Sequence, residues 1–299
     1  MSAGDWGGMA VERPPLVVIA GPTASGKSAH ALALAEARGG VLINADASQV
    51  YADLPILSAA PSQAERARAP HRLFGTVDGA QACTAALWAS LAGAEIAAAH
   101  AQGRLPILVG GTGLYLRTLL DGIATVPGIK PQIRAAIRTM PPSEIRARLE
   151  AEDRVMAARL HPNDAQRNAR ALEVIRSTGR SLADWQSAPA EGGLEGRVAL
   201  EPLVIDRPRD ELVQRIDARV DAMWAAGALH EVKRLAARGL SPALPAMRTI
   251  GVPPLLAHLA GELSVAEALA RWKLDTRQYA KRQATWLRNQ LGGWPRMSI

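Results

Sequence analysis

The sequence Gly21-Pro22-Thr23-Ala24-Ser25-Gly26-Lys27-Ser28 lies between an apolar, β-branched run at 16–20 and an Ala-rich run at 29–37. These flanks predict a strand before the octapeptide and a helix after it. At this spacing the glycines let backbone N–H groups converge on phosphate oxygens, Lys27 reaches the outer phosphates and the Ser28 hydroxyl can hold Mg²⁺. The positive end of the helix dipole lies at the same spot. The stretch therefore predicts a phosphate-binding loop, but it leaves open whether the phosphates belong to a nucleotide or to another substrate.

The composition is that of a globular protein. With 299 residues and 48% hydrophobic content, the chain can build a full α/β core and carry an added subdomain. Its single cysteine, Cys83, excludes an internal disulfide, favours a reducing cytosol and is expected to be buried. Residues 1–8 are Gly-rich without a basic start or an apolar segment, which predicts a flexible leader. No apolar run approaches the ~20 residues that span a bilayer, so we expect a cytoplasmic protein.

The net charge of +7 is unevenly distributed. Residues 130–180 hold eleven Lys and Arg against six Asp and Glu, and residues 271–296 hold seven against one. Two such basic segments favour a large polyanionic partner, because a grip on phosphates needs clustered cations. The same charges would also suit arginines that only solvate the helices of an Ala- and Arg-rich protein.

Two further apolar runs end in polar residues. The run at 41–45 ends at Asp46, and the run at 105–109 ends at Gly110-Gly111-Thr112. In open α/β sheets, ligands bind beyond the carboxyl ends of the strands, so we expect Asp46 and Thr112 near the phosphate-binding loop. An ordinary turn or helix-capping role would explain either residue as well.

The sequence predicts a P-loop-type α/β core, with a mostly parallel sheet flanked by helices, and a helical insertion. We expect the core at 9–126 and 201–299 and the insertion at 127–200, where the helices are Arg-rich and strand signals are few. Residues 52–80 lack a clear period and predict mobile connections.

Within the insertion, one helix is clearly marked. It begins after Asn163 or Asp164 and stops at Gly179. On this helix Gln166, Arg167 and Arg170 share one side and suit phosphates or base edges. Pairing of Arg170 with Glu173 on a solvated face is the alternative.

The C-terminal part predicts a strand at 203–205, a long helix from Asp210 and a final helix that starts at Ser264 with Glu267 in a capping box. Arg215 and Arg219 are one turn apart and suit the phosphate site, although a surface ladder with Asp217 and Asp221 would look similar. The final helix carries a cationic stripe and two tryptophans that we expect in the core. The stripe consists of Lys273, Arg277, Lys281 and Arg288; the tryptophans are Trp272 and Trp286.

Five motifs in register resemble the tRNA dimethylallyltransferase family. They are Gly21 to Ser28, Asp46-Ala47-Ser48-Gln49-Val50-Tyr51, Val109-Gly110-Gly111-Thr112-Gly113-Leu114-Tyr115, Asn163 to Arg167 with Arg170 to Val174, and Thr276 to Gln283. The resemblance covers residues from about 14 to 290. It implies transfer of a dimethylallyl group from dimethylallyl diphosphate to N6 of the adenine 3′ to the tRNA anticodon, with Mg²⁺ as cofactor. The partners implied are the tRNA anticodon stem-loop and the diphosphate donor, and we expect a monomer.

The resemblance also implies a role for each matching residue. Asp46 is in the position of the general base, Thr112 hydrogen-bonds near the reacting amine, Lys27 neutralises the diphosphate and Ser28 contributes to the metal. Phosphate binding falls to Gly21, Pro22, Thr23, Ala24, Ser25, Gly26, Lys27, Ser28, Arg215 and Arg219. Contact with tRNA falls to Asp46, Ala47, Ser48, Gln49, Thr112, Arg134, Gln166, Arg167, Asn168, Ala169, Arg170, Arg248, Arg277 and Lys281.

The sequence departs from the family pattern at a few positions. Val252-Pro253-Pro254 replaces a segment that usually carries a cation, and two prolines remove backbone donors from an implied tRNA contact. A different function also fits the loop alone: in a small-molecule kinase or a nucleotide hydrolase it would hold ATP, and Asp206 would stand at a strand end as a metal ligand. That reading leaves the basic segments and the other four motifs without a role.

Overall fold

A computed structural model describes residues 13–188 and 190–299, so the leader predicted at 1–8 lies outside the described residues. The chain forms two compact units. The first, here called the core unit, consists of the described residues up to Leu119 together with Leu194–Ile299. The second, the insertion unit, is Leu120–Gly193. Both boundaries precede those expected at 127 and 200.

The earlier boundaries have a local cause. The chain segments that enter and leave the insertion unit pair with each other, since Ile123 and Glu191 form an antiparallel bridge. Just outside it, the Leu194 N–H donates to the Leu119 carbonyl at 3.0 Å. Such pairing joins residues that are far apart in the sequence. The glycine and proline residues used to predict the boundaries indicate only local turns, so they could not predict it.

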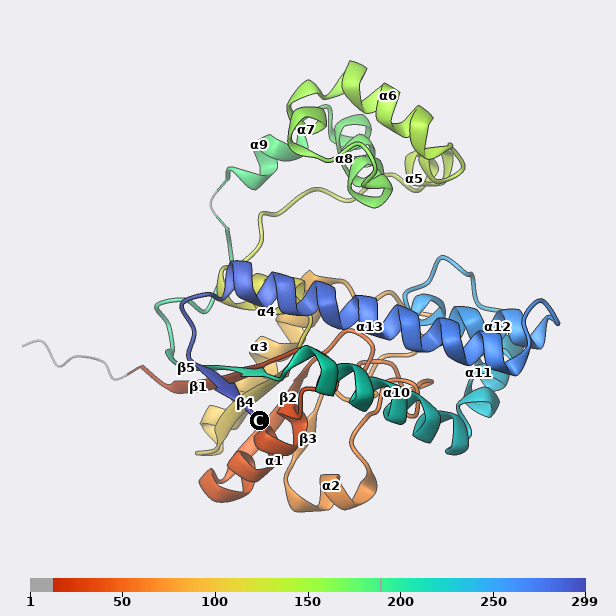
Figure 1. Ribbon diagram of the computed structural model, residues 1–299. Coiled ribbons are helices and arrows are strands. Elements are labelled where there is room, and N and C mark those ends of the chain that lie inside the picture. Colours follow the sequence, from red (N-terminus) through yellow and green to blue (C-terminus); the bar gives the residue numbers. More distant parts are fainter. Residues whose placement is uncertain (1–12, 189) are drawn as a thin grey trace, which may run out of the picture. The chain divides into compact units, whose positions relative to one another are not determined.

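The core unit is built on a six-stranded parallel sheet in the order β3-β2-β4-β1-β5-β6, which confirms the predicted α/β class (Figure 1). The central strands are apolar and buried, as parallel strands covered on both faces must be. Its strands are β1 Pro15–Ala20, β2 Gly40–Ala45, β3 His71–Arg72, β4 Leu105–Gly110, β5 Ala199–Asp206 and β6 Arg296–Ser298.

The helices of the core unit pack on this sheet and on one another. Helices α1 and α3 both contact β2 and β4, and the long helix α13 packs along α10 (Figure 1). Cys83 is buried as expected. The helices are α1 Lys27–Arg38, α2 Gln63–Arg68, α3 Ala85–Ala101, α4 Gly113–Leu120, α10 Arg209–Ala225, α11 Ala228–Ala237, α12 Val252–Leu259 and α13 Val265–Gln290, with a 3₁₀ turn at Ala246–Arg248.

The segment at 52–80 is more structured than expected. It contains α2 and the edge strand β3, and Tyr51 bridges to Val77 in parallel. Leu54 and Phe74 are buried in the core. The expected irregular conformation therefore holds for most of this segment, and its helix and strand were not predicted because a six-residue helix and a two-residue strand are too short to show a period.

The insertion unit is a small helical bundle, as predicted. Asp164 caps α8 by accepting the Arg167 N–H, and Gly179 ends it with φ of 71°. The helices are α5 Pro131–Arg138, α6 Pro142–Glu152, α7 Arg154–Arg159, α8 Ala165–Thr178 and α9 Leu182–Gln186. They surround a core that includes Ile137, Leu149, Leu172 and Val174.

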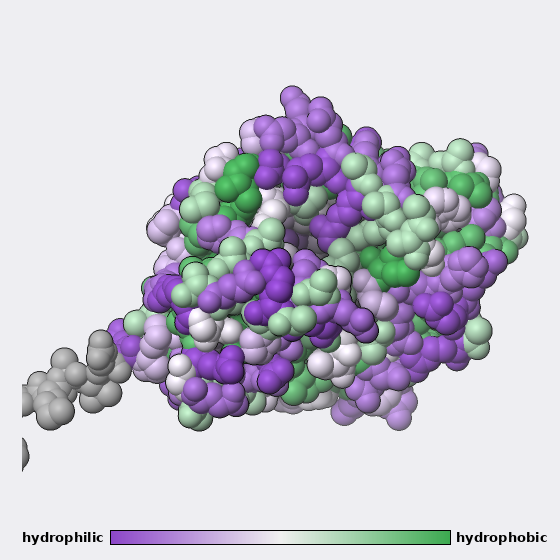
Figure 2. All heavy atoms as spheres, turned by 90° about the horizontal axis from the view of Figure 1, so that it is seen from below, coloured by the Kyte–Doolittle hydropathy of each residue, from purple (hydrophilic) through white to green (hydrophobic). Residues whose placement is uncertain are grey.

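The departure at Val252-Pro253-Pro254 has a structural explanation. These residues open α12, where the missing N–H groups of proline have no helical partner to lose. Val252 and Pro254 are buried, so this turn packs inward. Among the described residues, no helix is both long and apolar enough to cross a membrane. Hydrophilic residues cover most of the face drawn in Figure 2, with smaller apolar groups between them.

Helix α13 fixes two turns of the core unit through one side chain. The capping box of Ser264 and Glu267 starts this helix, and Trp272 is buried in the core as predicted. Near its other end, Gln283 Oε1 accepts the Thr23 N–H at 2.8 Å and Gln283 Nε2 donates to the Gly111 carbonyl at 2.9 Å. The phosphate-binding loop and the turn after β4 are thus tied to the same amide.

Replacing Gln283 by leucine should leave the Thr23 N–H and the Gly111 carbonyl without a hydrogen-bond partner. Because Gln283 is buried, we expect the free energy of unfolding to fall by about 2 kcal/mol or more. Urea denaturation of the whole chain measures it. The matched control is Gln278→Leu, at an exposed position of the same helix, which should shift stability by less than about 0.5 kcal/mol. Equal midpoints for the two variants would contradict the role given to Gln283.

Candidate active site

The loop at 21–28 has the shape of an anion cradle. Gly26 has φ of 99° and Ala24 has φ of 63°, so the backbone turns through left-handed conformations before α1 begins at Lys27. No side chain caps the start of α1, which leaves its first N–H groups for a ligand. A Cβ on Gly21 would lie 2.7 Å from Ser25 Oγ and 2.8 Å from the Ile205 carbonyl, so this position requires glycine.

Several side chains hold the loop in this shape. Besides Gln283, Arg215 Nε donates to the Ala24 carbonyl at 2.9 Å, and Arg207 Nε donates to the Ser25 carbonyl at 3.5 Å. The backbone adds a bond from the Gly21 N–H to the Gly110 carbonyl. Arg215, predicted to touch phosphate, supports the loop itself and does not line the cavity that begins there, and Arg207 was not predicted from the sequence.

One cavity of the core unit begins at this loop and changes character along its length. Its charged and polar lining near the loop includes Thr23, Lys27, Ser28, Asp46, Ser48 and Arg219, and further polar residues line the rest, namely Gln49, Ser58, Thr249, Thr276 and Tyr279. Its apolar lining consists of Leu57, Ile216, Val220, Met223, Ile250 and Trp272. Lys27, Ser28, Asp46, Ser48, Gln49 and Arg219, all predicted site residues, are therefore brought together as expected.

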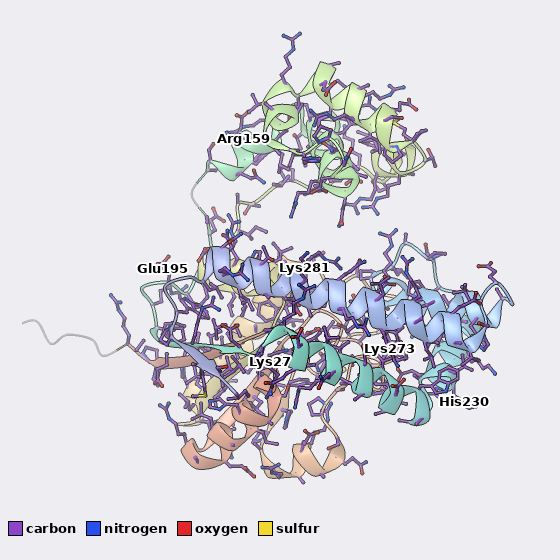
Figure 3. The ribbon with its side chains drawn as sticks, viewed as in Figure 1. Lys27, Arg159, Glu195, His230, Lys273 and Lys281 are labelled. Atoms are coloured by element: carbon purple, nitrogen blue, oxygen red, sulfur yellow. The ribbon has the colours of Figure 1, made fainter. Side chains whose placement is uncertain are left out.

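Lys27 lies deep in the polar part, at the start of α1 and beneath α10 (Figure 3). Its Nζ donates to the Pro22 carbonyl at 3.1 Å. Burial lowers the pKa of Lys27 to about 8; the Asp46 carboxylate opposes this shift and the Arg219 guanidinium adds to it. Burial also lowers the pKa of Arg219, which remains a cation. Two cations, Lys27 and Arg219, and the carboxylate of Asp46 thus line the same part of the cavity.

Asp46 is oriented by its neighbours. Its Oδ1 accepts the Ser48 N–H at 3.0 Å and the Ser48 hydroxyl at 2.8 Å, and no described hydrogen bond uses Oδ2. Behind it, the fully buried Asn44 accepts the Asp46 N–H and donates to the Asp46 carbonyl. This backbone clamp leaves one carboxylate oxygen to act on a ligand in the cavity.

Thr112 connects Asp46's segment to α13. Its hydroxyl oxygen accepts the Ala47 N–H at 2.9 Å, and its own N–H donates to the Ala45 carbonyl. Burial and the Asp46 charge raise the pKa of Tyr279, while a hydrogen bond from Thr112 and the charge of Arg282 oppose the shift. Tyr279 is therefore a neutral phenol beside the carboxylate, and the sequence reasoning missed it. Its position four residues before Gln283 on α13 was the available signal.

The cationic stripe of α13 is divided. Lys273 and Arg277 pair with Asp221 and Asp217 of α10, the latter through Nε to Oδ1 at 2.9 Å. The acidic residues of the predicted ladder thus pair with α13 and not with Arg215 or Arg219. Lys281 and Arg288 are exposed, and so is Arg248. Trp286 packs against Gly113 at the start of α4.

The predicted residues of the insertion unit differ in what their side chains do. Glu173, which is 1% exposed, lies 3.7 Å from Arg134, 3.2 Å from Arg138 and 3.9 Å from Arg170. Arg170 and Glu173 thus form a pair, but around a buried carboxylate and not on a solvated face.

The remaining side chains of α8 follow two patterns. Gln166 and Arg167 are exposed, and Arg167 pairs with Asp164 at 2.6 Å. Asn168 is buried and its amide donates to the carbonyls of His161, Pro162 and Asp164. That amide is therefore used to hold the chain before α8. Ala169 is partly buried and packs against the core of the unit.

A divalent cation fits the polar part of the cavity. Ser28 is exposed and lines the cavity, and a hydroxyl oxygen together with phosphate oxygens is what Mg²⁺ prefers. Among the described residues, no group of three His, Cys, Asp or Glu could hold a metal alone. Asp206, the alternative metal ligand, pairs with Arg296 at 2.5 Å and does not line the cavity.

Comparison with known proteins agrees with this site. The family model described as IPP transferase matches residues 49–290, and the one described as isopentenyl transferase matches residues 14–76. The tRNA dimethylallyltransferase of Sphingopyxis alaskensis is 60% identical over 283 residues, which are 94% of this chain and 92% of the relative. That of Rhodospirillum rubrum is 56% identical over 282 residues, 93% of this chain and 86% of the relative.

Solved structures agree as well. A structure of a eukaryotic dimethylallyltransferase acting on tRNA is similar with a TM-score of 0.80 and 29% identity, covering 95% of this chain and 74% of that one. The tRNA isopentenylpyrophosphate transferase of Bacillus halodurans has a TM-score of 0.68 and 32% identity, covering 96% and 90%. Since the IPP transferase model spans most of the chain and the two curated relatives share more than half of its aligned residues, the chain belongs to the IPP transferase family of tRNA dimethylallyltransferases.

Proposed function

We propose that this protein transfers a dimethylallyl group from dimethylallyl diphosphate to N6 of the adenine 3′ to the anticodon of tRNA. The observation that supports this most is the polarity of the cavity, which starts at a phosphate-binding loop and continues along apolar side chains of α10 toward Trp272 of α13. A diphosphate with a short hydrocarbon tail likewise has a charged end and an apolar end. The hypothesis of a kinase or hydrolase accounts for the loop. It does not account for the apolar part of the cavity or for the family to which the chain belongs.

The donor's diphosphate is expected against the loop. The N–H groups at the start of α1, Lys27 and Arg219 supply positive charge for it, and the leaving diphosphate needs this charge most when the C–O bond breaks. Mg²⁺ held by Ser28 and the diphosphate oxygens would supply further charge neutralisation there. The metal is our proposal from the donor set alone.

The proposed step moves one bond and one proton. The N6 amine forms a bond to C1 of the allyl group while the C1–O bond breaks, and the electron pair of that bond leaves with the diphosphate. The amine proton passes to Asp46, whose Oδ2 is free to accept it. Tyr279 and Thr112 fix the polar surroundings of the reacting nitrogen. Since N6 is a weak nucleophile, removing its proton as the bond forms is a large part of the catalysis.

The tRNA is expected to bind through exposed cations of both units. Lys281 and Arg248 of the core unit are exposed. In the insertion unit, the side-chain exposure is 49% for Arg134, 75% for Arg167 and 40% for Arg170. The target base has to leave its stack to reach a recessed cavity, so backbone contacts must hold the stem meanwhile. A cytoplasmic monomer is part of the same proposal.

The transfer itself is tested with unmodified tRNA and labelled dimethylallyl diphosphate, and in parallel with ATP. We expect label in the tRNA and no comparable ATP turnover. ATP turnover without transfer of label would refute the proposed function.

The general-base role is tested by Asp46→Asn in single-turnover reactions. The amide keeps an acceptor for Ser48 but cannot take a proton, so the chemical step should slow by ~10²–10⁴ while tRNA binding is kept. Asp206→Asn, a strand-end carboxylate outside the cavity, is the control and should react normally. A normal rate for Asp46→Asn would remove Asp46 from the mechanism.

The proposed phosphate contact of Arg134 is tested by the salt dependence of tRNA binding. No described hydrogen bond uses its guanidinium, so Arg134→Gln should weaken binding and reduce the slope of log K against log salt by about 1. Arg176→Gln is the matched control, since Arg176 is paired one to one with Glu152. Identical slopes for both variants would speak against the contact.

The low pKa of Lys27 predicts proton uptake when diphosphate binds. At pH 8 about half of the Lys27 amines are neutral, and a bound anion favours the charged form, so binding should take up about half a proton per site. Affinity should consequently fall as the pH rises above 8. Calorimetry of inorganic pyrophosphate binding in two buffers measures the uptake, and Lys27→Met corrects for the ligand's own protons. No difference between the two proteins would contradict the shift.

A further inference from the structure

Glu231 of α11 is a buried carboxylate that the proposed mechanism does not use. It is 0% exposed, and its two oxygens accept neighbouring backbone N–H groups, Oε1 from Ile56 and Oε2 from Leu57, both at 2.8 Å. Burial raises its pKa, while these two hydrogen bonds and the charge of Arg234 oppose the shift. Burying such a group is unfavourable unless it is fully hydrogen-bonded. Its role must therefore lie in the segment that it holds.

That segment is held from a second side. Gln49 Nε2 donates to the carbonyls of Ser58 at 3.0 Å and Ala59 at 2.9 Å. Ala59 has φ of 50°, a conformation that a residue with a Cβ keeps only where its surroundings hold it. Four successive residues, here called the 56–59 loop, are thus fixed by one carboxylate and one amide.

The 56–59 loop supplies part of the cavity wall. Leu57 and Ser58 line the cavity, and Leu57 is buried. A Cβ on Gly251, which has φ of 98°, would lie 2.7 Å from Trp272 Cε2 and 3.0 Å from Leu57 Cδ2. Leu57 and Trp272 therefore both lie against the same bare glycine, and both line this part of the cavity.

This wall lies far from the phosphate-binding loop. Along α13, Gln283 touches the loop, Tyr279 and Thr276 follow on the cavity side, and Trp272 comes last. At 1.5 Å per residue, Gln283 and Trp272 are roughly 16 Å apart along the helix axis. Along α10, Arg215 touches the loop and Met223 lines the cavity two turns further on. Trp272 and Met223 therefore lie toward the end of the cavity that is away from the residues touching the loop.

We propose that Glu231 is a positioning residue that limits the length of the prenyl donor. By holding the 56–59 loop it keeps Leu57 against Trp272, so the apolar part of the cavity ends where a five-carbon tail ends. A longer prenyl diphosphate, bound by the same loop at 21–28, would meet this wall. The proposal rests on the proposed function, in which the apolar part of the cavity takes the donor's tail.

The test compares two donors on unmodified tRNA: dimethylallyl diphosphate, with five carbons, and geranyl diphosphate, with ten. The quantity measured is the ratio of kcat/KM for the ten-carbon donor to that for the five-carbon donor. Partial unfolding lowers both values equally and leaves this ratio unchanged. Leu57→Ala should raise it about ten-fold or more by removing the wall. Glu231→Gln turns an NH₂ group toward one of the two N–H donors, so the 56–59 loop is held less firmly. This variant should therefore also raise the ratio of kcat/KM values.

A double variant tests whether Glu231 acts through Leu57. Once Leu57 is alanine, Glu231→Gln should change the ratio by less than about two-fold, because the side chain that it positions is gone. Asp153→Asn is the matched control: this buried carboxylate also holds a backbone N–H, that of Met156, but lies in the insertion unit. Its ratio should equal that of the unaltered protein.

An unchanged ratio of kcat/KM values in Leu57→Ala would overturn the proposal. If Glu231→Gln does not fold, Leu57→Ala alone tests whether the wall limits donor length. A rise in the KM for tRNA in place of a changed donor ratio would also overturn it, because the wall would then face the base. In both cases the unaltered protein still transfers the five-carbon group. Failure of that transfer would instead refute the proposed function.

Discussion

The amide of Gln283 is the contact on which the arrangement of the site depends. It joins the backbone of the phosphate-binding loop at Thr23 to the turn after β4 at Gly111, two segments that end neighbouring strands. The loop would otherwise rely on arginine contacts to Ala24 and Ser25, and a flexible loop loses entropy on binding an anion. Because Gln283 belongs to α13, the same helix that carries Tyr279 and Trp272 also sets the loop. The polar and apolar ends of the cavity are therefore in fixed register.

The cavity combines charge and apolar surface in a way that explains the buried cations. Lys27 and Arg219 are held with Asp46 where few polar groups solvate them, which lowers the pKa of both cations. Such a site is unfavourable when empty and becomes favourable when a multiply charged anion enters. In the proposed reaction, binding energy from the diphosphate is thereby concentrated at the bond that breaks. The apolar remainder, ending at Leu57 and Trp272, gives the bound donor its direction.

The sequence was sufficient for features that depend on local geometry. The loop at 21–28, the parallel sheet and the caps at Asp164 and Ser264 follow from a few adjacent residues, and the structure agrees with them. It was insufficient for side chains whose partners are far away in the chain. Gln283 and Glu231 are both of residue types that are common on helices, and only the fold brings them to Thr23 and Leu57. An element as short as β3 shows no period in the sequence, and the early boundaries of the insertion unit depend on pairing between distant residues.

The most direct measurement of this account is a crystal structure of the protein with Mg²⁺ and a non-reactive thiolo analogue of dimethylallyl diphosphate. We predict the diphosphate at the N–H groups of residues 24–28 beside Lys27, with the allyl group between α10 and α13 and C1 near Asp46. A hydrocarbon tail that points to solvent, or a diphosphate bound away from the loop, would contradict the account.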